Sequence, residues 1–149
     1  MAVTPLEQAC TYIHRGWAPI PIPHGTKGPT IPGWQELRLD EAAAAQHFNG
    51  EQQNIGILTG PASHGLVDVD LDCAEAVALA DGYLPRTRSV FGRQSKRRSH
   101  RLYRLTDEPT IRCEKYVDPA DQEVLLELRG DRHQTMAPPS VHPSGEAVA

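Results

Sequence analysis

The stretch Gly65-Leu66-Val67-Asp68-Val69-Asp70-Leu71-Asp72 decides how the chain folds, because apolar and acidic residues alternate along it. Alternation with a period of two predicts a β-strand. Successive side chains of a strand point to opposite faces of its sheet. The apolar side chains are therefore expected on one face, and the carboxylates of Asp68, Asp70 and Asp72 on the other, about 7 Å apart along the strand.

These carboxylates need a reason to share one face. Like charges in a row on a half-buried strand repel one another and resist the loss of solvent. A divalent cation such as Mg²⁺ or Mn²⁺ would remove the conflict, because it prefers carboxylate oxygens. The simpler alternative is an edge strand that faces solvent and uses its charge to prevent aggregation. A calcium loop is excluded, because Cys73 follows Asp72 where such a loop has glycine.

Length and composition favour one loop-rich α+β domain. The 149 residues can enclose a core, and 12 Gly and 13 Pro with 5% aromatic residues argue against a helical bundle. The three distant cysteines form no C-x-x-C pair, so we expect neither a disulfide framework nor a zinc site. No run approaches the roughly 18 apolar residues of a membrane span, and the first residues lack the pattern of a signal peptide. These features predict a cytoplasmic protein with no membrane partner.

Positive charge is concentrated in one segment, although the formal net charge is −4. Residues 86–104 hold eight of the 15 Lys and Arg and none of the 19 acidic residues. Such a segment is typical of a phosphate-binding surface, and the alternative is a solvated run of charges. The eight side chains are Arg86, Arg88, Arg93, Lys96, Arg97, Arg98, Arg101 and Arg104.

Local patterns predict the other elements. Helices are expected over residues 4–15, 41–48 and 73–80, the first two capped by Thr4 and Asp40. The further strands are expected over 17–22, 54–60, 89–91, 100–105 and 123–129. Prolines place the 17–22 strand at a sheet edge. We expect residues 93–99 to form a loop and residues 133–137 to return as a hairpin against 123–129.

Three of the predicted strands carry the groups that a metal and phosphate site needs. The first provides the carboxylates, the second opens with Ser99-His100, and the third contains Glu127. Transfer of a nucleotide requires two cations, carboxylates that hold them, and cationic or hydrogen-bonding groups for the triphosphate. The sequence therefore contains each kind of group that nucleotidyl transfer uses.

In this order the motifs resemble those of the archaeo-eukaryotic primase superfamily. They are most similar to the bifunctional primase/polymerase (prim-pol) N-terminal domain of phage and plasmid replication proteins. The pattern is hhhDhD, with h an apolar residue, then S-H at the start of a strand, then an acidic residue in an apolar strand. Further stretches that carry the resemblance are Gly16-Trp17 with Pro19-Ile20-Pro21, Lys27 with Pro29, Gly33-Trp34, Asn54-Ile55-Gly56 with Thr59-Gly60, Phe91-Gly92-Arg93, Tyr103, Glu127-Leu128-Arg129-Gly130 and Pro138-Pro139-Ser140-Val141-His142-Pro143-Ser144-Gly145.

The resemblance implies a fold and a site. The fold is α+β, with an RRM-like mixed or antiparallel catalytic sheet, flanking helices and a small N-terminal α/β subdomain. Residues 1–149 would form one catalytic domain that is shorter at its C-terminus than is usual in the family. The catalytic residues would be Asp70, Asp72, His100 and Glu127. The metal ligands would be Asp70, Asp72 and Glu127, with Asp68 and Asp70 as the alternative register of the first motif. Many relatives have Asp where this chain has Glu127.

The same resemblance implies the surrounding contacts. Nucleotide would be bound by Arg93, Ser95, Lys96, Arg97, Ser99, His100 and Arg129, and DNA by Lys27, Arg86, Arg88 and Arg98. The cofactor would be Mg²⁺ or Mn²⁺ in a two-metal site, with no zinc expected, because no cysteine accompanies His133 and His142 at the spacing of a zinc finger.

The activity that the resemblance implies is template-directed nucleotidyl transfer by a DNA primase/polymerase that replicates a phage, plasmid or other mobile element. Its partners would be NTP or dNTP, a single-stranded DNA template, and a replicative helicase domain in trans or in a longer parent chain. Two alternatives stay open. One is a non-catalytic module that binds nucleotide or single-stranded DNA, and the other is a two-metal nuclease.

Overall fold

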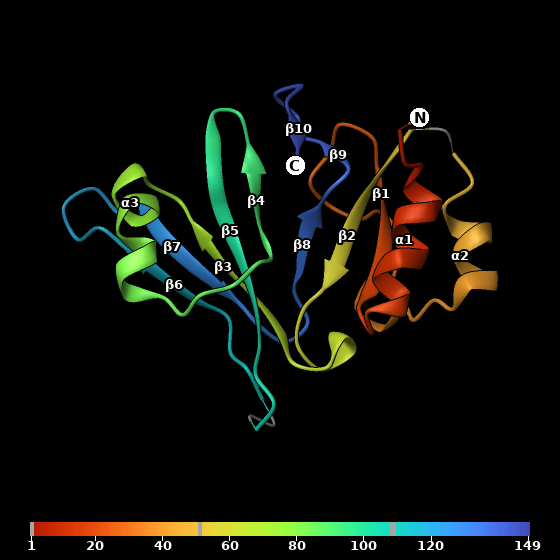
Figure 1. The fold of residues 1–149 in the computed structure, drawn as a ribbon, viewed down its shortest axis with the longest axis horizontal. Helices are drawn as coiled ribbons and strands as arrows, with labels where there is room; N and C mark the ends of the chain where they lie inside the picture. Colours follow the sequence, from red (N-terminus) through yellow and green to blue (C-terminus); the bar gives the residue numbers. More distant parts are fainter. Residues whose placement is uncertain (1, 51, 108–109) are drawn as a thin grey trace.

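The two larger antiparallel sheets of the described residues lie side by side, with helices on their outer faces (Figure 1). The structure is a computed structural model and describes residues 2–50, 52–107 and 110–149. The larger sheet has the order β4 (Val90–Arg93), β5 (Lys96–Arg104), β3 (Leu66–Leu71), β7 (Val124–Arg129) and β6 (Glu114–Val117). The smaller sheet has the order β1 (Ala18–Pro23), β2 (Gln53–Leu58) and β8 (Gln134–Ala137). This arrangement confirms the α+β class.

Strand β3 lies at the centre of the larger sheet and is buried along its whole length. Asp68 is 0% exposed and Asp70 is 5% exposed. The prediction of a strand is confirmed, and the alternative of a solvent-facing edge strand is wrong. The register places Asp70 opposite His100 of β5 on one side and opposite Glu127 of β7 on the other. The fold therefore brings the three predicted polar strands together.

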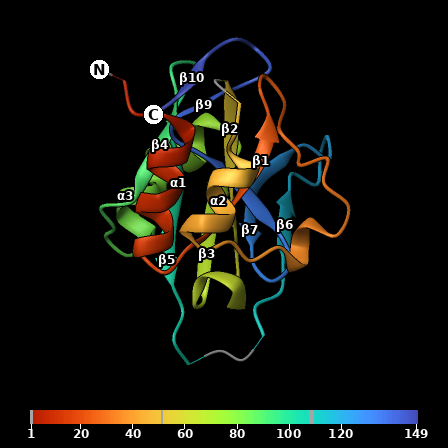
Figure 2. The ribbon, with the colours of Figure 1, turned by 90° about the vertical axis from the view of Figure 1, so that its right-hand side faces the viewer.

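The helices begin where the sequence places their caps. Thr4 and Glu7 form a capping box at the start of α1 (Pro5–His14), and Asp40 accepts a hydrogen bond from the backbone of Ala43 at the start of α2 (Glu41–His47). Both helices cover the smaller sheet (Figure 2). Helix α3 (Ala74–Tyr83) covers the face of the larger sheet that carries Val69 and Leu71, opposite the face of the carboxylates.

One hydrophobic cluster joins the two sheets. It contains Tyr12 of α1, Ile55 of β2, Leu66 of β3, and Phe91 and Leu102 of the β4–β5 hairpin. Because the cluster takes side chains from both sheets and from α1, the small N-terminal part and the larger sheet pack as one core.

Two sequence expectations about strands are wrong. Residues 133–137 do not return against 123–129: β8 crosses to the smaller sheet and pairs with β2. The N-terminal sheet is thus completed by a C-terminal strand. The basic segment is also not a loop, because β5 begins at Lys96 and only the turn at Gln94 and Ser95 connects it to β4.

A small hairpin of β9 (Ser140–Val141) and β10 (Ala147–Val148) spans the end of both sheets. The Asn54 side chain of β2 binds the backbone N–H and C=O of Val141, at 2.8 Å each. On the other side, the Glu146 carboxylate accepts hydrogen bonds from the Ser95 backbone N–H (2.6 Å), the Ser95 hydroxyl (2.7 Å) and Arg93 Nε (3.1 Å). The hairpin is therefore attached to both sheets.

We expect the Glu146→Gln variant to lower the thermal midpoint by a few degrees at pH 7. Hydrogen bonds from Ser95, and after them Ser144 and Arg93, lower the pKa of Glu146 from 4.5 to about 2. A carboxyl whose pKa is lowered in the folded state stabilises the fold above its unfolded pKa, and this stabilisation is lost as the pH falls toward the folded value. The difference between wild type and variant should therefore shrink between pH 4.5 and pH 2.

Thermal unfolding followed by circular dichroism at several pH values measures this. The exposed Glu123→Gln variant is the control and should match wild type throughout. A Glu146→Gln variant that matches wild type at pH 7 would show that the contacts of Glu146 with Ser95 and Arg93 do not stabilise the fold.

Candidate active site

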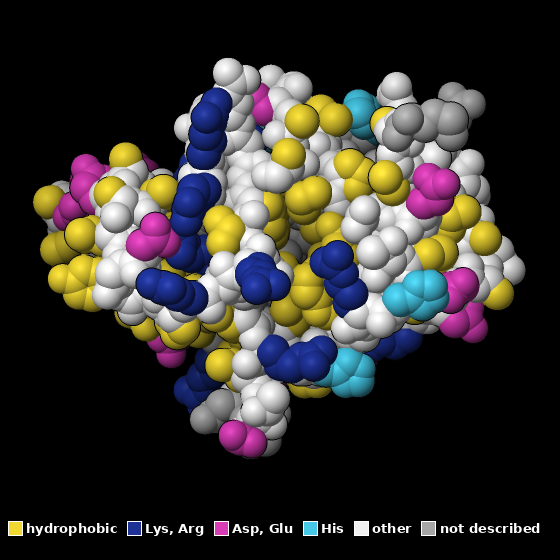
Figure 3. All heavy atoms as spheres, viewed as in Figure 1, with side chains coloured by type: hydrophobic (Ala, Val, Ile, Leu, Met, Phe, Trp, Pro, Cys, Tyr) yellow, Lys and Arg dark blue, Asp and Glu magenta, His cyan; other side chains and the backbone are white. Residues whose placement is uncertain are grey.

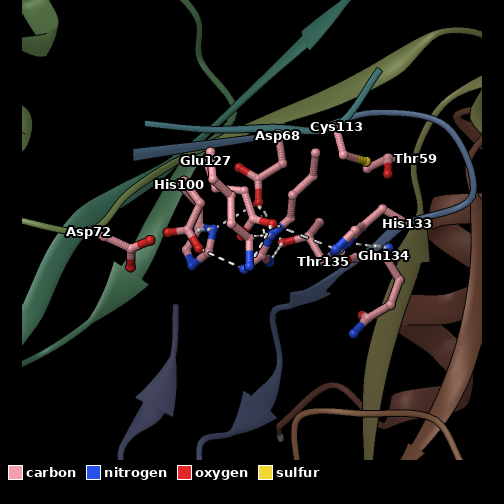
Figure 4. A network of polar contacts seen from close by, with 12 residues as sticks. Thr59, Asp68, Asp72, His100, Cys113, Glu127, His133, Gln134 and Thr135 are labelled. Carbon is pink, nitrogen blue, oxygen red and sulfur yellow. Dashed lines mark hydrogen bonds and ion pairs between the residues drawn. The ribbon is translucent and has the colours of Figure 1, made fainter. Parts of the chain in front are cut away.

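Three carboxylates converge at the end of β3, and Figure 4 shows two of them, Asp72 and Glu127. One ligand atom from each of Asp70, Asp72 and Glu127 lies within 4.8 Å of the others. Asp70 belongs to β3, Glu127 stands beside it on β7, and Asp72 follows β3 directly, where its backbone N–H donates to the Leu125 carbonyl at 2.8 Å. Strand pairing therefore sets the spacing of these acids.

Two basic side chains balance this charge. Arg129 of β7 donates from Nη2 to Asp70 Oδ2 at 2.7 Å, and its Nε lies 3.4 Å from Glu127 Oε2. Lys96 Nζ forms an ion pair with Asp72. Both bases were predicted to bind nucleotide, and the structure places each of them on a carboxylate. Arg129 and Lys96 therefore neutralise part of the negative charge of these three carboxylates.

The cluster also suits a divalent cation. Asp70 Oδ1 is buried and accepts no hydrogen bond within the described part of the chain, so this oxygen has lone pairs to offer. Burial raises the pKa of Asp70 even though His100 and Arg129 lie close to it. An ionised carboxylate that has lost its solvent gains from a cation, and oxygen donors are the ligands of Mg²⁺ and Mn²⁺. The residues present therefore fit a divalent metal ion.

Asp68 has a different set of partners. Its Oδ2 accepts hydrogen bonds from His100 Nδ1 at 2.8 Å and from the Thr135 hydroxyl at 2.6 Å. Burial favours the neutral acid, but His100, Arg129 and Thr135 together hold the pKa of Asp68 below its usual value. An ionised Asp68 can only accept, so His100 carries a proton on Nδ1. Asp68 lies outside the group of three carboxylates and anchors His100 instead.

His100 is fixed on a second side as well. The Phe91 ring stacks on it with centroids 4.7 Å apart and planes inclined by 9°. With Nδ1 directed to Asp68, the Nε2 edge of the ring is left for other contacts. Two neighbours therefore determine which edge of His100 a bound molecule can meet.

A hollow of about 390 Å³ adjoins the carboxylates and lies between the two sheets. From the larger sheet come Asp70, Lys96 and His100, whereas Gln134 and Met136 come from β8. Lys27, from the segment after β1, also lines it. Its volume falls within the range of small-molecule sites, and it combines acids that can hold a cation with bases that can hold phosphate.

Comparison with known proteins agrees with this geometry. The family described as Prim-Pol, bifunctional DNA primase/polymerase, N-terminal, matches residues 9–149. The chain belongs to this prim-pol family. No curated protein matches it. Membership implies nucleotide and DNA as substrates and a role in DNA replication. No helix in the described ranges is long and apolar enough to cross a membrane.

Some of the other residues predicted to bind nucleotide in this prim-pol domain line the hollow, and others lie outside it. Arg93 and Ser99 line the hollow with Lys96 and His100. Ser99 is buried, and its hydroxyl has no hydrogen-bond partner among the described residues. Ser95 instead binds Glu146, which Arg93 also contacts. Arg97 is exposed and borders a separate hollow beside Asp72.

The predicted DNA-binding residues do not form one surface. Lys27 lines the hollow, whereas Arg86 and Arg88 are exposed between α3 and β4. Arg98 pairs with Asp81 of α3 at 3.3 Å, on the face of the sheet away from the carboxylates. Lys and Arg side chains form a column over the β4–β5 hairpin on the face shown in Figure 3. The basic segment thus serves two faces of one sheet.

Several residues of the site were not among the predicted site residues. Thr135 and Gln134 reach it because β8 crosses to the other sheet, and no local pattern indicates that crossing. His133 Nε2 lies 3.7 Å from Glu127 Oε1 for the same reason. His142 lines the hollow from the β9–β10 hairpin. Finding these residues would have required knowledge of which distant strands pair, such as β8 with β2.

The two registers of the acidic motif can be separated by metal binding. We expect Asp70→Asn to weaken Mn²⁺ binding by at least about tenfold, because it removes a charged oxygen ligand. Asp68→Asn should leave Mn²⁺ binding within about threefold of wild type, because Asp68 holds His100 rather than the cluster. Titration followed by electron paramagnetic resonance of free Mn²⁺ measures both affinities.

Thr135→Val serves as a second test, because it removes a hydrogen bond to Asp68 and keeps the carboxylate. It should behave as Asp68→Asn does. Equal loss of Mn²⁺ affinity in Asp68→Asn and Asp70→Asn, with folding intact, would show that Asp68 is itself a ligand.

Proposed function

We propose that this chain is a template-directed nucleotidyltransferase that makes or extends a DNA strand by a two-metal mechanism. The observation that carries the proposal is the convergence of Asp70, Asp72 and Glu127 beside a hollow lined with basic side chains. Family membership over residues 9–149 supports the same reaction class.

Asp70, Asp72 and Glu127 would hold the divalent cations. Bound cations would supply Lewis acidity, which activates the primer 3′-hydroxyl and stabilises charge on the leaving pyrophosphate. Lys96 and Arg129 neutralise these carboxylates in the structure. With divalent cations held by these carboxylates, Lys96 and Arg129 would be available to phosphate oxygens at the same place.

His100 would contact the phosphates of the incoming nucleotide. Its Nδ1 is committed to Asp68 and its face to Phe91, so the Nε2 edge is the one that can meet phosphate. Ser99, Arg93 and Lys96 line the same hollow and would share this task. Arg97 and Ser95, beside the hairpin turn, are weaker candidates for a phosphate contact because they lie outside its lining.

DNA would be held by positive charge at the edge of the hollow and on the surface outside it. Arg86 and Arg88 are exposed, and Lys27 stands at the hollow itself. Arg98 contributes least, because Asp81 already pairs with it. Binding through phosphate contacts should weaken as the salt concentration rises.

We further propose that the protein serves the replication of a mobile element. Its partners would be a single-stranded template, NTP or dNTP, and a helicase domain in trans or in a longer parent chain. The single-domain assignment stays a prediction.

Primer extension on a single-stranded template tests the proposal. With labelled dNTPs and Mn²⁺, wild type should extend the primer, and the Asp70→Ala/Asp72→Ala variant should lose activity by about 10³-fold or more, because metal catalysis supplies several kcal/mol. Glu114→Gln, an exposed acid on β6 of the same sheet, should keep full activity.

Other outcomes identify the alternatives. Nucleotide binding without product, in Mg²⁺ and in Mn²⁺, would indicate a non-catalytic binding module. Shortening of the labelled strand without nucleotides would indicate a nuclease. Unchanged extension by the double variant would contradict the assignment of the metal ligands.

His100→Ala should raise the KM for nucleotide by about tenfold, as expected for loss of a hydrogen bond to a charged group. Affinity for template should not change, because His100 faces the hollow rather than the outer basic surface. Steady-state kinetics with varied nucleotide, and fluorescence anisotropy with labelled template, measure the two effects separately. A change in template affinity alone would contradict the phosphate role.

A further inference from the structure

His142 occupies the turn between β9 and β10 in a single protonation form. Its Nδ1 accepts a hydrogen bond from the Ser144 backbone N–H at 3.1 Å and lies 2.8 Å from the Ser144 hydroxyl. A backbone N–H can only donate, so Nδ1 carries no proton. The neutral imidazole therefore has its proton on Nε2, and that nitrogen is a hydrogen-bond donor.

This donor has no use within the described part of the chain. His142 Nε2 is shielded from solvent and has no hydrogen-bond partner there. The ring lines the hollow that also contains Asp70 and Asp72. A buried polar group without a partner costs about 1–3 kcal/mol. An unpaired donor at the wall of a binding hollow indicates a partner that arrives with the ligand.

The turn holds the ring in a fixed position. Asn54 binds Val141 from the smaller sheet, and Ser95 and Arg93 bind Glu146 from the larger one. The Ser144 hydroxyl also donates to Glu146 at 2.9 Å, which connects the turn that contains His142 to the contacts of Glu146 with the larger sheet. The donor is thus positioned before any ligand binds, and preorganised donors bind more strongly than mobile ones.

The charges around His142 select the chemistry of the partner. Burial, Arg93 and Lys27, and more weakly Lys96, lower the pKa of His142, and Glu146 opposes them. Glu146 is itself occupied by Ser95 and Arg93. A neutral donor surrounded by three basic side chains suits an anionic oxygen. The nucleotide phosphates are the anion that the proposed reaction brings into this hollow.

We propose that His142 Nε2 donates a hydrogen bond to a phosphate oxygen of the nucleotide bound in this hollow. The β9–β10 hairpin is then part of the nucleotide site, and the nucleotide contacts this hairpin as well as both sheets. This inference rests on the proposed function, because that function supplies the phosphate.

Two substitutions separate the donor from the turn. Asn at position 142 keeps an acceptor that can bind the Ser144 N–H, as in an Asx turn, but removes the donor that reaches the hollow. Gln places an amide nitrogen near the position of the imidazole Nε2. His142→Asn therefore tests the hydrogen bond with the turn preserved, and His142→Gln tests its rescue. His24→Asn, an exposed histidine outside the hollow, is the control.

Isothermal titration with dATP and with ATP, in Ca²⁺ and without template, measures binding in the absence of turnover. His142→Asn should weaken binding by about tenfold, with His142→Gln and His24→Asn within about threefold of wild type. Adenosine, which lacks phosphate, should bind all four proteins alike. Thermal unfolding should show that all four proteins are fully folded at the temperature of the titration.

Each other outcome overturns the inference. Wild-type affinity in His142→Asn removes the proposed contact while leaving the proposed function in place. Equal weakening in the Asn and Gln variants, or equal weakening for adenosine, shows that His142 acts through the turn or the base instead. A wild-type protein that binds neither nucleotide contradicts the proposed function and the inference together.

Discussion

Burial of charge on β3 is the constraint on which the rest of this structure depends. Asp68 and Asp70 lie on a central strand with almost no exposure, and an isolated buried carboxylate is costly. Each is stabilised by a side chain from another strand: Asp68 by His100 and Thr135, and Asp70 by Arg129. Because Thr135 belongs to β8 of the smaller sheet, its hydrogen bond to Asp68 also joins the two sheets.

Arg129 connects the acids of the two neighbouring strands β3 and β7. Arg129 contacts Asp70, lies near Asp68 and Glu127, and its pKa is raised by these three acids despite burial. The same guanidinium balances the charge of these acids and also lines the hollow. Removing one partner of such a set leaves another charge buried and unpaired, which is more costly than the pair is stabilising.

Local features of this fold could be predicted from the sequence, whereas long-range pairings could not. Thr4 and Asp40 cap their helices as expected, since a cap depends on only a few neighbouring residues. Alternation over 65–72 predicted both the strand and the shared face of its acids, but not burial on both sides, because alternation usually marks a half-exposed strand. The Arg-rich segment of β5 showed no such alternation, and its β-sheet partners compensate for its weak propensity.

The candidate site divides in the same way. Asp70, Asp72, Glu127 and His100 were predicted from their order along the chain, and the structure brings them to one place. The position of Asp68, bound to His100 rather than grouped with the other acids, followed from the strand register and not from spacing. The contacts of Thr135 and His142 became apparent only once β8 and the β9–β10 hairpin were placed.

The crossing of β8 also bears on how the protein is made. β1 and β2 lie early in the chain, whereas the strand that covers the free edge of β2 is β8. The paired residues Ile55 and Ala137 are about eighty positions apart in the sequence. Until the ribosome has released that segment, β1 and β2 form a two-stranded ribbon, which is marginally stable and open to strand addition by other chains. Contacts between such distant residues also slow folding. The free edge of β2 therefore stays exposed to other chains until β8 has been synthesised and has paired with it.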